Sequence, residues 1–169
     1  MNESAVSNTG PLLHLAEIGQ EGQLIIFERT TISDQVKGEL RRRDVFDRIA
    51  ATLGDHLMVE GVTQPELDAQ RVALTGFKVQ RTDVSVAALA ARLSPDVVLT
   101  DDLELRKGLK AQGYVVVGSV GVLVRAFKTG RVTKADLQGY LEQLFDGSTL
   151  YLSKGFGAHV RKLLDSLPD

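Results

Sequence analysis

The chain has 169 residues, of which 43% are apolar and 25% charged, which is typical of an ordinary folded domain with a sizeable core. It contains no cysteine, so disulfide bonds and thiolate metal sites are excluded, and its three histidines do not favour a histidine-rich zinc site. The net charge of −2 excludes a protein that coats nucleic acid with its whole surface, so any such contact must be local and assisted by positive charge, such as a bound metal ion.

Short apolar runs alternate with amphipathic stretches along the whole chain, without a repeat or a linker. In the first half, strands are expected at 5–7, 30–32 and 56–62, and helices after Pro11, after a cap at Ser33 or Asp34, at 44–53 and at 65–74. The apolar run 24–27 predicts a further helix, although its β-branched content leaves a strand open. In the second half we expect a helix capped by Thr82, strands at 97–100 and 114–117, and helices at 103–112, 119–128, 134–145 and around 156–167. This succession predicts an α/β fold whose parallel sheet is covered on both sides.

Polar side chains with carboxylate-type oxygens stand where these elements begin or end, namely Asn8, Glu39, Asp83 and the pair Asp101–Asp102. The pair directly follows a short apolar strand, and ligands of open parallel sheets bind beyond the carboxyl ends of the strands. Mg²⁺ and Mn²⁺ prefer such hard oxygen ligands, and nucleases use one or two of these ions to activate water and to stabilise the reacting oxygens. The pattern therefore indicates a divalent-metal site and phosphate chemistry.

Each of these residues also has an ordinary interpretation. One aspartate of the pair 101–102 can simply cap the following helix, and Glu39 can pair with Arg43 one turn later. Asp83 can complement a helix dipole, and Asn8 can be a turn residue with a left-handed backbone. From spacing alone, these interpretations remain open beside the metal site.

Three further features carry less information about function. His14 is interpreted as a packed or surface residue rather than a catalytic one. The run Arg41–Arg43 is typical of a solvated helix face, although it could also grip a phosphate backbone. The glycines at 118 and 121 do not make a dinucleotide-binding fingerprint, because the full glycine pattern and the downstream acid are missing.

Taken together, the segments around these residues resemble the PIN-domain family. More narrowly, they resemble its small PIN-like members of the VapC toxin type, a group described as predicted nucleic-acid-binding proteins. The similar segments are residues 6–19, 36–40, 83–90, 99–102, 117–123 and 128–130. The likeness covers nearly the whole chain and is least distinctive over residues 41–80.

The resemblance implies a three-layer α/β/α sandwich with a central parallel sheet, spanning residues 1–169 as a single domain. It implies Mg²⁺- or Mn²⁺-dependent cleavage of phosphodiesters, usually of RNA. Many small members are toxins held inactive by an antitoxin protein, and they commonly form homodimers. By position, Asn8, Glu39, Asp83 and Asp102 would bind the metal, and Asp101 would join Glu39, Asp83 and Asp102 in catalysis. The resemblance also assigns supporting hydroxyl groups to Thr9 and Thr100.

The first metal position departs from the wider family, which places Asp where this chain has Asn8. An amide oxygen can ligate Mg²⁺, but the loss of one negative charge should weaken metal binding and slow or abolish catalysis. A catalytically weak or inactive module that binds RNA or a partner protein is therefore the alternative function. Asp83 replaces the subfamily's usual Glu and shortens the reach of that carboxylate by one methylene.

Two further expectations concern location and an unrelated fold. The N-terminus lacks the basic and apolar segments of a signal peptide, and no apolar run approaches the ~20 residues that span a bilayer, so a cytoplasmic protein is expected. A flavodoxin-like receiver is a third, weaker alternative. It requires a Lys after a late strand, whereas the strand at 114–117 leads into Gly118 and Ser119.

Overall fold

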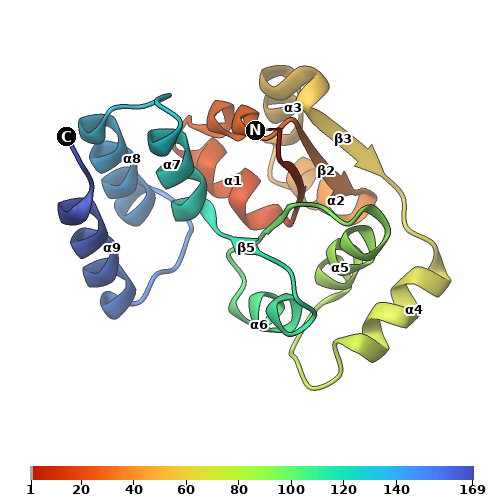
Figure 1. Cartoon of the computed structure of the whole chain (residues 1–169). Coiled ribbons are helices and arrows are strands. Elements are labelled where there is room, and N and C mark those ends of the chain that lie inside the picture. The colour runs from red at the N-terminus through yellow and green to blue at the C-terminus, as the bar shows by residue number, and fades with distance from the viewer. Residues whose placement is uncertain (1) are drawn as a thin grey trace.

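The computed structural model describes residues 2–169, and its centre is a five-stranded parallel sheet (Figure 1). The strands are β1 (Ser4–Ser7), β2 (Arg29–Ser33), β3 (Leu57–Glu60), β4 (Val97–Leu99) and β5 (Val116–Val117). They lie in the order β3-β2-β1-β4-β5 and pair in parallel throughout. A flavodoxin-like sheet has the order 2-1-3-4-5 instead, so the receiver alternative is wrong.

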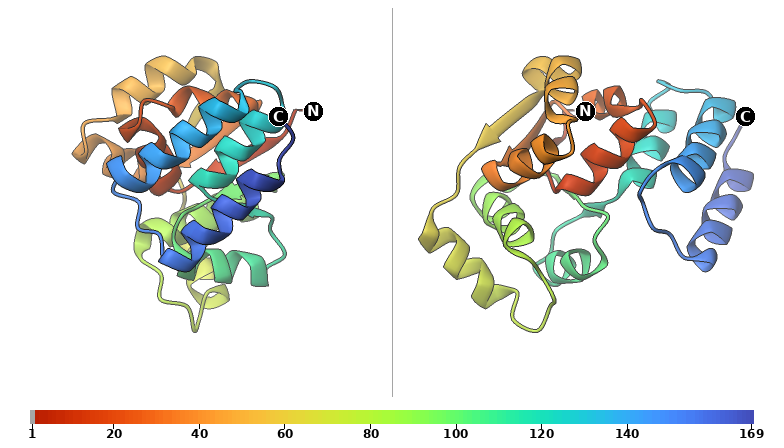
Figure 2. Two further views of the ribbon diagram at one scale, coloured as in Figure 1. Left: turned by 90° about the vertical axis from the view of Figure 1, so that its left-hand side faces the viewer. Right: turned by 180° about the vertical axis from the view of Figure 1, so that it is seen from behind.

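Helices cover both faces of this sheet, as the expected three-layer sandwich requires (Figures 1 and 2). Helices α4, α5 and α6 lie on one side, and α1, α3, α7 and α8 lie on the other. The helices are α1 (Thr9–Glu17), α2 (Asp34–Arg42), α3 (Phe46–Leu53), α4 (Gln64–Ala73), α5 (Arg81–Leu93), α6 (Leu103–Ala111), α7 (Ser119–Lys128), α8 (Lys134–Gly147) and α9 (Lys154–Ser166), with short 3-10 helices η1 (Glu21–Ile26) and η2 (Gly54–His56).

The core forms where the apolar strands meet the apolar helix faces. All three residues of β4 are buried, and so are Leu12 and Leu15 on α1. Each fully buried side chain of this size contributes about 1.5–3 kcal/mol of transfer free energy. The well-packed centre of the sheet, formed by β1 and β4, therefore fixes the positions of the residues that follow these two strands.

Helix boundaries follow local sequence signals at most ends. Ser33 caps α2 by accepting a hydrogen bond from the amide of Val36 at 3.1 Å, and Thr133 opens α8 with a capping box. Gly113 has φ +91°, a backbone conformation that favours glycine, and it ends α6 as expected.

Some expectations from the sequence are wrong in detail. Gln80, and not Thr82, is the N-cap residue of α5. Asn8 has φ −75° and caps α1 in an extended conformation, so it is not a left-handed turn residue. The last strand is shorter than expected because Val115 is 56% exposed and lies outside β5. The expected apolar face of the last helix is only partly covered, and Val160 is its buried residue.

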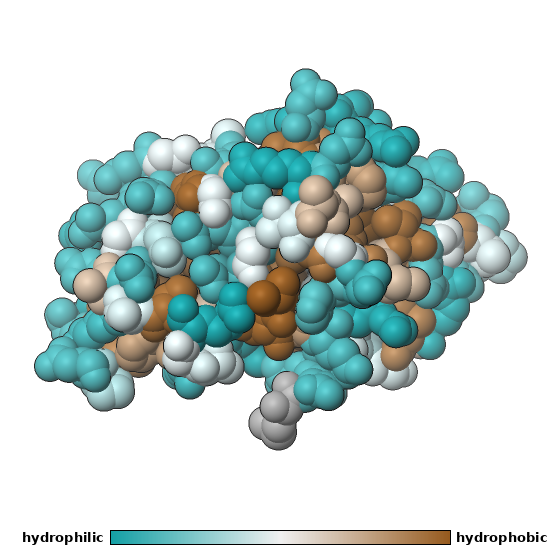
Figure 3. All heavy atoms as spheres, turned by 90° about the horizontal axis from the view of Figure 1, so that it is seen from above, coloured by the Kyte–Doolittle hydropathy of each residue, from teal (hydrophilic) through white to brown (hydrophobic). Residues whose placement is uncertain are grey.

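The surface of the molecule is mainly hydrophilic on the side seen in Figure 3, with hydrophobic residues interspersed among polar ones. Large apolar side chains such as Val72 on α4 and Leu103 on α6 are exposed at separate places. Within residues 2–169, no helix has the length and the apolar character needed to cross a bilayer.

Candidate functional site

The candidate site begins where β1 and β4 end side by side. Ser7 pairs with Leu99 in register, so Asn8 and Thr100 leave the sheet next to each other. The backbone amide of Asn8 donates to the carbonyl oxygen of Leu99 at 2.8 Å, which fixes this junction. Asp102 follows two residues later as the N-cap of α6. The topology therefore places a polar residue from each central strand at the same edge of the sheet.

Asn8 and Asp83 form a buried polar pair at this edge, being 7% and 8% exposed. The side-chain amide of Asn8 donates to Oδ1 of Asp83 at 3.1 Å and to Oγ1 of Thr100 at 3.2 Å. The other oxygen of Asp83 accepts a hydrogen bond from the backbone amide of Gln80 at 2.9 Å. The amide oxygen of Asn8 accepts no hydrogen bond from any described residue, so it remains available to a ligand.

Burial is the main reason why the pKa of Asp83 lies above its usual range, because a charged carboxylate is poorly solvated there. The negative charges of Asp102 and Glu39 raise this pKa further, while the hydrogen bonds from Gln80 and Asn8 lower it. Asp102 and Glu39 therefore lie close enough to Asp83 to act on it electrostatically. Such mutual repulsion favours the uptake of a proton or a cation.

Glu39 is held by hydroxyl groups from two other helices. Thr9 on α1 donates to Oε2 at 2.5 Å, and Thr82 on α5 donates to Oε1 at 2.7 Å. No ion pair links Glu39 to Arg43 anywhere in the part of the chain that the structure describes, so the predicted pairing one turn later is wrong. Hydroxyl donors leave the negative charge of Glu39 in place and fix its direction.

The two adjacent aspartates have different surroundings. Oδ1 of Asp101 accepts a hydrogen bond from the amide of Ser119 at 2.7 Å, and Oδ2 contacts the Ser119 hydroxyl and Nδ1 of His14, the latter at 2.7 Å. Asp102 is exposed and uses Oδ1 to accept from the amide of Leu105 at 2.8 Å. Its Oδ2 makes no hydrogen bond within residues 2–169. Asp101 therefore ties its loop to α1 and α7, whereas Asp102 caps α6 and keeps one oxygen free.

All of these polar residues line one open cavity of about 1010 Å³. Its wall also contains Arg106, which is half-buried and donates from Nη2 to the carbonyl oxygen of Thr100 at 3.1 Å. The opposite wall comes from α7 and from the C-terminal residues 150–163. A smaller cavity of about 330 Å³, between α8 and α9, is lined by no acid.

A family model for a PIN domain, DUF3368, matches residues 4–166. This chain belongs to the PIN-domain family. Among solved structures, the VapC20 toxin of Mycobacterium tuberculosis, which cleaves the sarcin–ricin loop, matches with a TM-score of 0.50 and 19% sequence identity. The match covers 66% of this chain and 97% of that one, and at this identity it concerns the fold alone. A comparison with curated protein sequences finds no significant match.

The donor set of this PIN domain suits Mg²⁺ or Mn²⁺. Carboxylate oxygens of Glu39, Asp83 and Asp102 and the amide oxygen of Asn8 are hard ligands, and Mg²⁺ usually takes one or two carboxylates and keeps several waters. Among residues 2–169, however, no three His, Asp or Glu side chains lie close enough together to form a ready-made metal site. The chemistry of the donors suits such an ion, but the described residues form no ready-made cage for it.

Most polar residues of the candidate site were predicted from the sequence. The structure brings Asn8, Glu39, Asp83 and the pair 101–102 to one cavity. The expected supporting hydroxyls of Thr9 and Thr100 do contact Glu39 and Asn8. The contacts of Thr82, Ser119 and His14 were missed. Ser119 offered a signal, because it lies two residues after the strand at 114–117 and therefore near the same edge of the sheet.

Proposed function

We propose that this PIN-domain protein is a metal-dependent endoribonuclease and that it acts as the toxin of a toxin–antitoxin pair. The observation that carries the proposal is the position of Asp83, which is buried beside Asn8 and within electrostatic reach of Glu39 and Asp102. Membership of the PIN-domain family supports the same chemistry. A bound Mg²⁺ or Mn²⁺ would supply an activated water and would stabilise the charge on the reacting phosphate.

The side chains of this proposed site have separate tasks. Glu39, Asp83 and Asp102 hold the ion, and Asn8 orients Asp83 through its amide nitrogen while offering its oxygen to the ion. Asp101 is a positioning residue, because hydrogen-bond donors from α1 and α7 already engage both of its oxygens. It keeps the loop after β4 in the place where Asp102 can face the cavity.

Arg106 is suited to hold a phosphate of the RNA beside this ion. Its guanidinium group is fixed by the carbonyl oxygen of Thr100, and it forms no ion pair with any described residue. The backbone at Gly118 packs closely against it, since a Cβ atom there would lie 2.9 Å from Nη2. An arginine that is positioned but not neutralised can bind a phosphate oxygen at this edge of the sheet.

The direct test is cleavage of a single-stranded RNA in Mg²⁺ or Mn²⁺ by the wild type and by Asp102→Asn. Asparagine caps a helix about as well as aspartate, so α6 should stay folded while a ligand charge is lost. Glu104→Gln removes an acid from the same helix, away from the donor set, and serves as the control. The proposal predicts cleavage by the wild type and the control only. It is wrong if Asp102→Asn cleaves as fast as the wild type.

A second candidate function is a module that binds RNA or a partner protein without cutting. The hydrogen bond from Asn8 to Asp83 favours it, because the amide stabilises the buried carboxylate without any metal ion. Such a module would retain RNA or its partner in pull-down experiments and would take up no Mn²⁺ in calorimetry. Restoration of cleavage by Asn8→Asp would show that this one residue accounts for the loss of activity.

The toxin role adds a protein partner and an effect on cell growth. We propose that an antitoxin covers the cavity and that the protein works as a homodimer in the cytoplasm. Induced expression of the wild type should arrest growth, and Asp102→Asn should not. A small reading frame that overlaps the upstream end of the gene would identify the antitoxin, whose co-expression should restore growth.

A further inference from the structure

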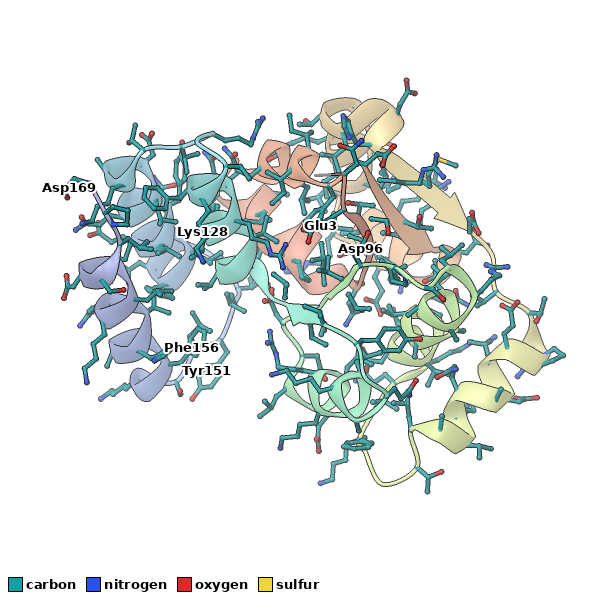
Figure 4. All side chains as sticks on the ribbon, viewed as in Figure 1. Glu3, Asp96, Lys128, Tyr151, Phe156 and Asp169 are labelled. Carbon is teal, nitrogen blue, oxygen red and sulfur yellow. The ribbon has the colours of Figure 1, made fainter. Side chains whose placement is uncertain are left out.

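Two aromatic side chains face the cavity from the wall opposite the acids. Tyr151 precedes α9 and is 89% exposed, while Phe156 in the first turn of α9 is 41% exposed. Both line the same cavity as Asp83 and Asp102. In Figure 4 the two labelled side chains lie on the side of the C-terminal segment that faces the core. The cavity therefore has an acidic end on the sheet and an aromatic end on residues 150–163.

These rings contribute little to the folding of the chain. Within α9 only Val160 is buried, and Leu163 and Leu164 are partly buried against the core, so the helix packs on the core without the ring of Phe156. Tyr151 forms no hydrogen bond with any described residue through its hydroxyl group. The ring of Phe156 has His159 as its aromatic neighbour, at 6.4 Å between ring centroids. Large exposed rings that gather in one cavity usually mark a binding surface.

The wall of the cavity opposite the acids also contains a lysine that forms no ion pair within the described residues. Lys128, at the end of α7, is exposed and forms no ion pair with any residue from 2 to 169. By contrast, Arg125 on the same helix forms an ion pair with the carboxylate of Glu3. A lysine without an ion pair and exposed rings that line one cavity are the combination that single-stranded nucleic acid needs, since its bases stack on aromatic faces and its phosphates require cations.

We propose that Tyr151 and Phe156 form a base-stacking subsite for single-stranded RNA, with Lys128 holding an adjacent phosphate. The inference rests on the proposed ribonuclease function and identifies the part of the cavity that would give the RNA its binding affinity. Without metal, the negative charges of the acidic end offset the attraction of Arg106 for phosphate, so another part of the cavity must supply binding energy. At about 1010 Å³ the cavity is as large as the largest usual small-molecule pockets, which leaves room for more than one nucleotide.

The experiment measures binding of a fluorescently labelled oligouridylate in EDTA, where the metal-dependent step cannot occur. Tyr151→Ala should weaken binding about tenfold, the typical contribution of one stacked base, whereas Tyr151→Phe should keep the wild-type affinity because it keeps the ring. Val72→Ala removes an exposed apolar side chain on α4, outside the cavity, and should change nothing. Phe156→Leu keeps apolar volume on α9 and should still weaken binding.

Tyrosine emission gives an independent reading, because the chain has no tryptophan and three tyrosines, of which Tyr114 and Tyr140 are half-buried. An oligouridylate that stacks on Tyr151 should quench this emission in the wild type. In Tyr151→Phe the quenching should disappear although the RNA still binds. Quenching of equal size in both proteins would contradict the subsite.

The outcomes separate this subsite from the proposed function. If the wild type cleaves RNA and Tyr151→Ala leaves both EDTA binding and the KM unchanged, the subsite is wrong and the nuclease stands. If ring-dependent binding occurs without any cleavage, the subsite stands and the nuclease is wrong. A change in oligomeric state without a change in RNA affinity would show that the rings serve a protein interface, which also overturns the subsite.

Discussion

The two ends of the cavity differ in how firmly the fold holds them. At the acidic end, Asn8, Glu39 and Asp83 are bonded to side chains or backbone groups from α1, α5 and the end of β4. At the aromatic end, Tyr151 is exposed, and α9 has one buried residue, Val160, beside leucines that are only partly buried. Bond cleavage requires fixed geometry, whereas stacking tolerates movement, so the difference suits a site that reacts at one end and recognises its substrate at the other.

The largest effects are expected in the kinetics of RNA cleavage, where a variant at the acidic end should change kcat and one at the aromatic end should change KM. Asp102→Asn should lower kcat for RNA cleavage by at least about a hundredfold, the size typical of losing a group that stabilises charge in the transition state. Tyr151→Ala should raise KM and leave kcat nearly unchanged, because stacking acts before and during the reaction alike. Steady-state kinetics in Mn²⁺ measures both parameters. Equal losses of kcat in the two variants would contradict the division between the ends.

Asn8→Asp tests the acidic end through stability. A carboxylate facing Asp83 would replace a hydrogen bond with repulsion between two buried charges, so the free energy of unfolding in EDTA should fall by about 1–3 kcal/mol. Mn²⁺ should restore this loss by binding more tightly to the variant than to the wild type. Urea unfolding with and without Mn²⁺ measures the effect. A variant that is equally stable in EDTA would show that the two side chains do not share a pocket.

Val160→Ala tests the aromatic end in the same manner. Removing two buried methyl groups should cost about 1–2 kcal/mol and loosen α9, because no other residue of this helix is buried. Hydrogen exchange should become faster in residues 154–166 and stay unchanged in β4. Metal binding should be unaffected while RNA affinity falls. Faster exchange around Asp102 would mean that the two ends are coupled.

The pH dependence should give the smallest effect. Because the pKa of Asp83 is raised in the folded protein, mainly by burial, its ionisation destabilises the fold at neutral pH. Without metal, stability should therefore rise as the pH falls through this raised pKa toward the ordinary pKa of an aspartate. Mn²⁺ affinity should decline over the same interval, since the ion needs the ionised carboxylate. Asn8→Ala removes a donor that lowers this pKa, so the decline should begin at a higher pH.

The two ends also differ in what the sequence could predict. Asn8 and Asp102 could be placed because each follows a short apolar strand, and parallel strands bring such residues to one edge. That Glu39 and Asp83 join them came from the family resemblance, because helix positions far apart in the chain give no periodic signal. The sequence predicts Thr82 as a helix cap because its side chain suits that role locally, whereas its hydrogen-bond partner in the structure, Glu39, lies 43 residues away.

The aromatic end was the less predictable part. Phe156 belongs to a regular apolar stripe on the last helix, and such a stripe usually predicts burial. Tertiary packing buries Val160 and partly covers Leu163 and Leu164, whereas Phe156 is 41% exposed and lines the cavity. Amphipathic periodicity shows which face of a helix is apolar, and it does not show whether another element covers that face.

Calorimetric titration with Mn²⁺ tests most directly whether the acids form one ion site. The wild type should bind the ion saturably, and Glu39→Gln, Asp83→Asn and Asp102→Asn should each weaken binding at least about tenfold. Glu104→Gln changes a half-buried acid that does not line the cavity and should have no effect. Binding that survives all three substitutions, or that falls equally in Glu104→Gln, would contradict a shared site.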